Sequence, residues 1–228
     1  MIFFIFFLVV FYSGFLSLIF FGIFRLRRLK KNQVIDNLPY ISVIIPFRNE
    51  IENLQGLINE LEKQNYPAEK VKIILVNDHS DDGSREVVVE QIKELKSNFI
   101  LQDLPDEKNG KKSAICLGIS YSGNDDILLF TDADCRINKN WLASMAVSFQ
   151  KEDADMLLGP VVMKGENIIG KIQESESLSL LSVTMGFAGL KKPILSNGAN
   201  IMYKKSDVNL EEDPYKKDVS SGDDIFLM

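Results

Sequence analysis

The stretch that decides the fold is Ile127-Leu128-Leu129-Phe130-Thr131-Asp132-Ala133-Asp134-Cys135-Arg136. Its first four residues form a continuous apolar run, which is typical of a strand buried on both faces of a sheet. In extended chain, residues two apart point to the same side, so Asp132 and Asp134 present their carboxylates together just past the strand. Two hard oxygen ligands with the small Ala133 between them suit Mg²⁺ or Mn²⁺ that also binds phosphate oxygens. An isolated pair of this kind is more often a solvated acidic turn.

The composition bounds the classes of protein to which the chain can belong. Its 228 residues suffice for one α/β domain plus an anchor, and its net charge is −6. Five basic residues fall within residues 25–31, which leaves 21 basic and 32 acidic residues elsewhere, a net charge of −11. An acidic body argues against nucleic acid as the main partner. One histidine and two scattered cysteines do not support a structural zinc site.

The N-terminal segment predicts a membrane anchor. Residues 2–24 carry no charge, and at about 1.5 Å per residue they make a helix of roughly 34 Å, enough to cross a bilayer. A cleaved signal peptide is disfavoured because no basic residue precedes the run and no small-x-small site follows it. The basic cluster comes directly afterwards, so the positive-inside rule places the body in the cytoplasm, at the inner membrane. We therefore expect a transmembrane helix over residues 1–24 and a basic juxtamembrane linker over residues 25–39.

Strand and helix patterns alternate along the rest of the chain. Strands are expected at residues 41–45, 71–76, 99–101, 127–130, 156–162 and 201–203, and helices at residues 52–64, 85–95, 113–121 and 141–149. Pro46 is expected to end the first strand. The alternation predicts an α/β fold with a mostly parallel sheet and helices on both faces. Ligands bind at the carboxyl ends of such strands, so Asp78 and the pair Asp132 and Asp134 are expected at one edge.

Six motifs, most of them directly after an expected strand, occur in a consistent order. They are residues 43–50 (VIIPFRNE), 76–84 (VNDHSDDGS), 110–114 (GKKSA), 131–134 (TDAD), 197–200 (NGAN) and 222–224 (GDD). Together they resemble family 2 glycosyltransferases with the GT-A fold, in particular membrane-anchored bacterial members. The resemblance covers roughly residues 40–228. It implies a Rossmann-like GT-A domain there, a mostly parallel central sheet with flanking helices.

The resemblance implies a binding site for a nucleotide-sugar donor. Asp78 matches the residue that accepts hydrogen bonds from a uracil ring, a role that suits an ionised carboxylate, which only accepts. The alternative is that Asp78 caps the next helix. Three residues match the loop that lines the base and ribose, but Pro46 also fits a strand terminator and Glu50 a helix start. The three residues are Pro46, Phe47 and Glu50.

The phosphates and the sugar are implied to lie beside the paired acids. Asp134 matches the ligand of a metal ion, Mg²⁺ or Mn²⁺, that bridges the two phosphates, and Asp132 lies near the ribose or sugar and the metal. The ion would stabilise charge on the departing diphosphate. Lys111 follows a glycine turn and would add positive charge there. A solvated lysine is an equal alternative for that position.

The acceptor side is implied by the last two motifs. Asp224 matches the general base that removes the acceptor proton in an inverting reaction, and Asp223 would support the site. Asn197 and Gly198 match a loop near the acceptor. The alternatives are an acid pair at a helix N-terminus and a glycine that only serves a turn.

The resemblance therefore implies an inverting, metal-assisted glycosyltransferase. It would move a sugar from a UDP-sugar to a hydroxyl of a lipid-linked or cell-envelope glycan. Relatives usually continue with a Q-x-x-R-W-type segment and further transmembrane helices, so the domain over residues 40–228 is expected to lack its C-terminal part. The alternative is a catalytically impaired or truncated nucleotide-sugar-binding membrane protein. A sugar-nucleotide pyrophosphorylase is less favoured, because residues 46–50 hold no glycine for a phosphate loop.

Overall fold

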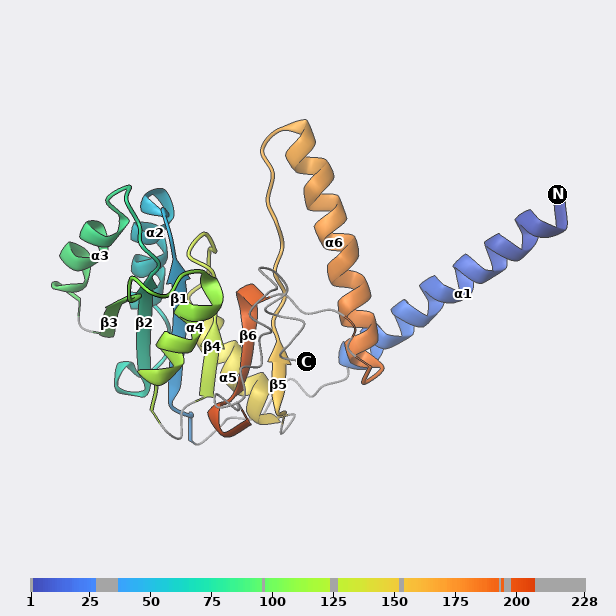
Figure 1. Ribbon diagram of the computed structural model, residues 1–228. Coiled ribbons are helices and arrows are strands. Elements are labelled where there is room, and N and C mark those ends of the chain that lie inside the picture. The colour runs from blue at the N-terminus through green and yellow to red at the C-terminus, as the bar shows by residue number, and fades with distance from the viewer. Residues whose placement is uncertain are drawn as a thin grey trace. The chain divides into compact units, whose positions relative to one another are not determined.

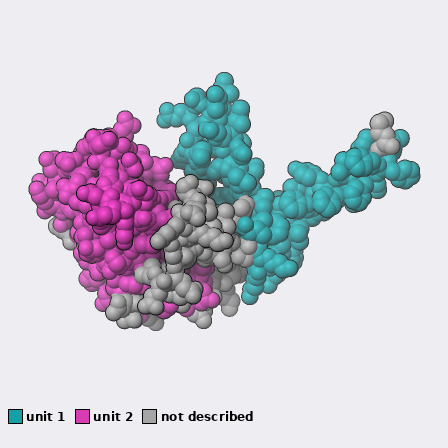
Figure 2. Space-filling view, in the orientation of Figure 1, with its two compact units in different colours: residues 1–34, 160–196 teal, residues 35–159, 197–228 magenta. Residues whose placement is uncertain are grey.

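A computed structural model describes residues 2–27, 37–95, 97–123, 127–151, 154–192, 194 and 198–207. The chain divides into two compact units (Figure 2). The first comprises residues 1–34 and 160–196, and the second comprises residues 35–159 and 197–228. The second unit contains the sheet, and the first contains two long helices.

The second unit is built on a sheet of six strands in the order β3-β2-β1-β4-β6-β5 (Figure 1). The strands are β1 (Ile41–Phe47), β2 (Val71–Asn77), β3 (Asn98–Asp103), β4 (Ile127–Phe130), β5 (Met156–Leu158) and β6 (Ile201–Lys204). β1, β2, β3 and β4 pair in parallel, whereas β6 is antiparallel to both β4 and β5. The mostly parallel sheet expected from the alternating pattern is confirmed.

Helices cover both faces of this sheet. One face carries α2 (Ile51–Glu62), α3 (Ser84–Ile92) and α5 (Trp141–Lys151), and the other carries α4 (Lys111–Ser120). Val43 and Ile45 face the first layer and Ile44 the second, as the alternation of a strand requires. All three side chains are fully buried, which explains why this strand reads as a continuous apolar run.

Most expected elements are present with shifted ends, and one expectation was wrong. Pro46 does not end β1, since it pairs with Val76 and the strand runs on to Phe47. β4 ends opposite Ile44. Beyond Ile44, the backbone N–H groups of β1 that point to the β4 side therefore have no strand to donate to. A proline without an N–H is therefore tolerated there. The connections include short 3₁₀ turns η1 (Ala68–Lys70), η2 (Gly198–Asn200) and η3 (Lys205–Asp207).

The first unit contains α1 (Ile2–Arg27) and α6 (Ile168–Gly189). Within the described chain, α1 is the one helix long and apolar enough to cross a membrane, over Ile2–Leu26. Only 6% of its most apolar window is buried, which is unlike the core helix of a soluble domain. The helix expected at residues 2–24 is thus present. α6 takes in residues 168–181, where Glu174 and Glu176 lie among apolar and serine residues, and the small apolar residues that follow.

Candidate functional site

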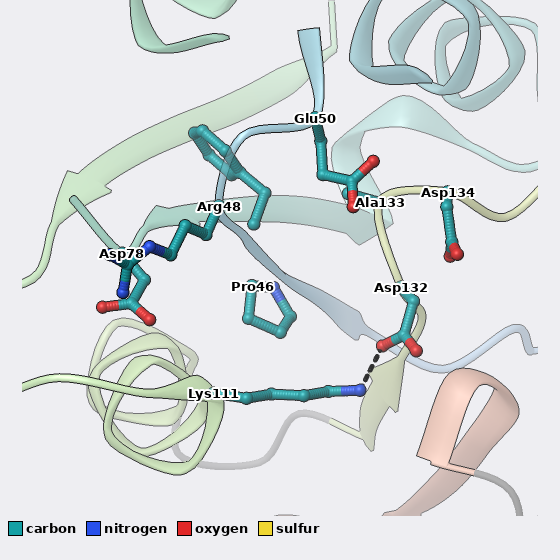
Figure 3. A pocket seen from close by; sticks show the side chains of 9 residues that line it. Pro46, Arg48, Glu50, Asp78, Lys111, Asp132, Ala133 and Asp134 are labelled. Carbon is teal, nitrogen blue, oxygen red and sulfur yellow. Dashed lines mark ion pairs between the residues drawn. The ribbon is translucent and has the colours of Figure 1, made fainter. Parts of the chain in front are cut away.

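The candidate site lies at the carboxyl ends of the central strands. Because β1, β2 and β4 run parallel, Phe47, Asn77 and Phe130 end these strands at the same edge. The loops that follow meet around an open cleft, which spans about 570 Å³ with its mouth included. The cleft is lined by Pro46, Phe47, Arg48, Glu50, Asp78, Lys111, Asp132, Ala133 and Asp134 (Figure 3).

Asp78 lies at one end of the cleft and the pair Asp132 and Asp134 at the other, with Pro46 between them (Figure 3). The structure thus brings together seven residues that the sequence analysis placed on the donor and metal side: Pro46, Phe47, Glu50, Asp78, Lys111, Asp132 and Asp134. They come from three strand ends and the start of α4, up to 88 positions apart in the chain. The roles assigned to them individually remain predictions.

The Asp78 carboxylate is held in place by neighbours from two loops. It is buried, with 6% of its surface exposed. One oxygen accepts a hydrogen bond of 3.0 Å from the Gly110 backbone N–H, and the other lies 3.0 Å from Nδ1 of His79. Gly110 has a φ of 86°, in the region that favours glycine. Asp78 is therefore fixed beside the cleft.

The alternative role of Asp78, capping α3, is not what the structure shows. α3 begins after Gly83, and Asp82 accepts a 2.9 Å hydrogen bond from the Ser84 backbone N–H. The Ser84 hydroxyl also bonds this carboxylate and lowers the pKa of Asp82. Asp78 makes none of these contacts, so its carboxylate is left to face the cleft.

Hydrogen bonds join the loop after β1 to the loop after β2. The Asn49 side chain donates to Asp81 at 2.8 Å and accepts from the Asp81 backbone N–H at 3.0 Å. The Glu50 backbone N–H donates to Ser84 Oγ at 2.8 Å. Asn49 and His79 both have a φ of 56°, a conformation that asparagine and histidine adopt more readily than most residues. These hydrogen bonds fix the two loops that border the cleft without the help of a ligand.

Asp132 and Asp134 share the cleft for a different reason from the one expected. The chain does not continue extended past β4 but turns, and the Cys135 backbone N–H donates to the Asp132 carbonyl at 3.2 Å. Both side chains still line the cleft. Ala133 between them is buried, so the position favours a small side chain. Burial also raises the pKa of the Cys135 thiol.

Lys111 reaches across the cleft to the acid pair. It is the first residue of α4, and its Nζ lies 2.6 Å from Oδ1 of Asp132 (Figure 3). Their side chains are 42% and 33% exposed, so water screens the ion pair. Lys111 is therefore not a freely solvated lysine, and Asp132 carries a cationic partner.

The carboxylates in the cleft suit a cation that a ligand also coordinates, rather than a metal site made of protein side chains alone. Among the described residues, no three histidine, cysteine or acidic side chains come together as metal ligands. The acid pair offers two carboxylates, and Mg²⁺ is commonly held by one or two carboxylates plus substrate phosphates and water. The residues present therefore fit Mg²⁺ or Mn²⁺ held by Asp134 and Asp132.

The acceptor-side residues are only partly described. Gly198 opens the turn η2, which leads into β6 where Ile201 pairs with Phe130 at the end of β4. Gly198 thus lies at the same sheet edge but does not line the cleft. Nearby, Trp141 Nε1 donates to Asn200 Oδ1 at 3.1 Å. Asn197, Asp223 and Asp224 lie outside the described residues.

Arg48 lines the cleft although the sequence analysis gave it no role of its own. The signal was its position directly after β1, at the edge where parallel sheets bind ligands. It is the second cation in the lining, beside Lys111. The lining thus combines four carboxylates with two cations.

Comparison with solved structures supports the fold. A mannosyltransferase from Pyrobaculum calidifontis, solved with GDP-Man and Mn²⁺, superimposes with a TM-score of 0.59. The match covers 86% of this chain and 55% of that one at 17% identity. Such a likeness shows that the chain shares the fold of this enzyme.

Sequence relatives and a family model agree with each other. The chain is 28% identical over 190 residues to the glycosyltransferase AglE of Haloferax volcanii, covering 83% of this chain and 60% of AglE. It is 30% identical over 182 residues to the poly-beta-1,6-N-acetyl-D-glucosamine synthase of Staphylococcus aureus, covering 76% of this chain and 42% of the synthase. The chain thus spans about half the length of these relatives. The model of glycosyl transferase family 2 matches residues 42–209, and the chain therefore belongs to glycosyl transferase family 2.

Proposed function

We propose that the cleft binds a nucleotide-sugar donor together with Mg²⁺ or Mn²⁺, and that a UDP-sugar is that donor. The observation that supports this most directly is the layout of the cleft. A buried carboxylate stands at one end, and two carboxylates and a lysine stand at the other. A nucleoside diphosphate has the matching layout, a base at one end and phosphates at the other.

Asp78 is the proposed contact for the base. Its carboxylate accepts from Gly110 and faces His79, and an ionised carboxylate has room for further donors. A uracil ring offers the imide N–H that such an acceptor requires. The Pyrobaculum enzyme was solved with GDP-Man, but at 17% identity it shares the fold alone, so the choice of uracil rests on Asp78 and its motif.

The phosphates are proposed to bind between Lys111 and the acid pair. Four carboxylates and two cations line the cleft, so a diphosphate would meet excess negative charge there. A divalent cation held by Asp134 and Asp132 would offset that excess and would supply Lewis-acid stabilisation of the leaving group. Lys111 adds a cation that can leave Asp132 and face the phosphates.

The proposed transfer inverts the anomeric carbon. The acceptor oxygen forms a bond to that carbon as the bond from carbon to the diphosphate oxygen breaks, and the acceptor proton passes to Asp224. The role of Asp224 rests on its motif. The names of the relatives, AglE and a poly-N-acetylglucosamine synthase, support a glycan acceptor, which we propose is lipid-linked or part of the cell envelope.

The proposed location is the cytoplasmic face of the inner membrane. α1 has the length and apolar composition of a membrane span, and basic residues at 25–31 follow it. Positive charge next to a span favours the cytoplasmic side. A donor made in the cytoplasm would then meet an acceptor held in the membrane.

Calorimetric titration of the full chain with UDP tests the donor proposal. We expect binding that requires Mn²⁺ and that weakens at least about tenfold in Asp134→Asn, since hydrogen bonds and contacts to charged groups contribute about 1.5–3 kcal/mol. Asp155→Asn is the matched control, because its side chain is 90% exposed and outside the cleft. UDP binding that ignores Mn²⁺, or that weakens equally in both variants, would contradict the proposal.

A further inference from the structure

One face of α6 is covered by the segment that precedes it. Gly165 packs against Gly170, where an added Cβ on Gly165 would come within 2.0 Å of the Gly170 carbonyl carbon. The Met163 backbone N–H donates to Ser177 Oγ at 3.3 Å. A hydrogen bond from Lys171 lowers the pKa of Glu174, and a hydrogen bond from the Gly165 backbone lowers it further. Residues 170, 174 and 177 are three or four apart and share one helix face. That face is therefore occupied by the chain itself.

The opposite face of α6 begins with exposed apolar side chains. Ile168 is 81% exposed and Ile172 is 64% exposed, and Ile169 beside them is 69% exposed. Three large aliphatic side chains within five residues are unusual on a surface that meets only water. We therefore expect these side chains to contact an apolar partner.

The same face leads along the helix to α1. Residues 168, 172, 179, 183 and 186 recur at helical spacing, and at Gly186 the backbones of the two helices touch. A Cβ on Gly22 would lie 1.9 Å from the Gly186 carbonyl oxygen, and one on Gly189 would lie 2.0 Å from the Gly22 oxygen. Glycine at all three positions permits this approach, which is typical of helices packed in membranes.

The contact lies close to the end of the apolar span. Ile19 and Gly22 make it, and Arg25 is the first charged residue of α1, so the contact is about 5–9 Å from that charge along the helix. The two helices meet near their C-terminal ends and diverge toward their N-termini (Figure 1). If α1 crosses a bilayer, α6 leaves it at the level where the lipid meets water.

The charge of this unit fits a lipid surface. From the sequence, residues 1–34 and 160–196 hold nine basic and three acidic residues, a net charge of +6, whereas the rest holds 17 basic and 29 acidic, a net charge of −12. Lys191 and Lys192 are exposed just past the end of α6. Basic side chains beside an apolar face are typical of helices that lie on anionic membranes.

We propose that α6 lies in the membrane interface, with Ile168, Ile169 and Ile172 in the lipid and its flanking lysines among the headgroups. The proposal rests on the anchoring of α1 in the membrane proposed above. By connectivity, the turn that opens at Gly198 follows this helix after eight residues. A lipid-bound α6 would therefore tie the motif assigned to the acceptor side to the membrane in which a lipid-linked acceptor resides.

Quenching of added tryptophans by brominated lipid tests the proposal. The full chain is reconstituted in phosphatidylcholine–phosphatidylglycerol vesicles with and without dibromo-phosphatidylcholine, and the native signal of buried Trp141 is subtracted using the wild type. Ile172→Trp is the test variant and Ile169→Trp repeats it on the next side chain. Leu8→Trp reports on α1, and Lys63→Trp, an exposed position after α2, reports on the body.

We expect brominated lipid to quench Ile172→Trp and Ile169→Trp to an extent close to Leu8→Trp, and to leave Lys63→Trp unchanged. Quenching of Leu8→Trp with neither α6 variant quenched more than Lys63→Trp would overturn the α6 proposal and leave the anchor standing. Blue-shifted but unquenched emission from both α6 variants would also overturn it, because a second protein surface would then cover the face. An unquenched Leu8→Trp would overturn the anchor and the α6 proposal together.

Discussion

Lys111→Met is expected to change the binding of the cation and of the nucleotide in opposite directions. In the described structure Lys111 Nζ lies 2.6 Å from Asp132 Oδ1, where it competes with a metal ion for that carboxylate. With a diphosphate present, the same ammonium group is proposed to face the phosphates. Methionine keeps most of the length and apolar stem of lysine and removes the charge.

The geometry sets the size of both effects. The ion pair is partly exposed, at 42% and 33% of the two side chains, so its competition is worth about 0.5–1 kcal/mol rather than the value for a buried pair. Its loss should tighten Mn²⁺ binding in the absence of nucleotide by about two- to fivefold. Loss of a charged contact to phosphate costs about 1.5–3 kcal/mol, so UDP binding with saturating Mn²⁺ should weaken by about 10- to 150-fold.

Water-proton relaxation measures Mn²⁺ binding without nucleotide, and calorimetry measures UDP binding in saturating Mn²⁺. Lys108→Met is the matched control, since Lys108 is exposed in the loop that leads into α4 and lies outside the cleft. A small general effect of charge would appear in both variants and can be subtracted. Dissociation constants that move in the same direction in Lys111→Met would refute the placement of Lys111 between cation and phosphate.

Asp78→Asn should weaken UDP binding by about 10-fold or more, because the substitution affects a contact to the base that is worth about 1.5–3 kcal/mol. Binding of inorganic pyrophosphate, which has no base, should be unchanged. Equal losses of affinity for both ligands, measured by calorimetry, would contradict this prediction. Gly118→Ala should destabilise the chain by about 1–3 kcal/mol in urea unfolding, because its Cβ would lie 2.6 Å from Ile44 Cγ2; an unchanged unfolding midpoint would show that the helix can shift. Asp103→Asn should cost under about 1 kcal/mol at pH 7. The hydrogen bond from Arg85 lowers the pKa of Asp103, so this stabilisation is present above the unfolded-state pKa of about 3.9 and is lost as the pH falls through the lower folded-state pKa. A cost that grows on acidification would contradict that assignment.

The buried strands were the most predictable part of the fold. The apolar runs that became β1, β2 and β4 were recognisable because a central strand buries both faces and so avoids polar residues. Their parallel pairing followed from the helices between them, and this placed Asp78 and the acid pair at one edge. Long-range convergence was thus predictable from local patterns plus one topological rule.

Pairing detail was not predictable from local patterns. Pro46 reads as a strand terminator, and only the early end of β4 explains why β1 continues through it. The acid pair shares the cleft through a turn closed by the Cys135 N–H, which the sequence does not distinguish from extended chain. The ion pair of Lys111 with Asp132 joins α4 to the β4 loop, and no spacing in the sequence encodes it. Contacts between loops depend on the placement of whole elements.

The packing of α6 shows the same limit in another form. Residues 168–181 have no clean amphipathic pattern, because one face is covered by the residues just before the helix and another touches α1. Glycines 22, 186 and 189 look incidental in the sequence. Only the structure shows that they lie where the backbones of α1 and α6 are in contact.

Anomalous diffraction from Mn²⁺ in crystals of the chain grown with UDP tests the central claim most directly. The account predicts a manganese peak at the cleft, with Asp134 carboxylate oxygen at about 2.0–2.2 Å, close to the distance found for Mg²⁺, diphosphate oxygens on the same ion, and the uracil ring against Asp78. A peak remote from Asp132 and Asp134, or UDP bound at the cleft with no manganese beside its phosphates, would contradict it.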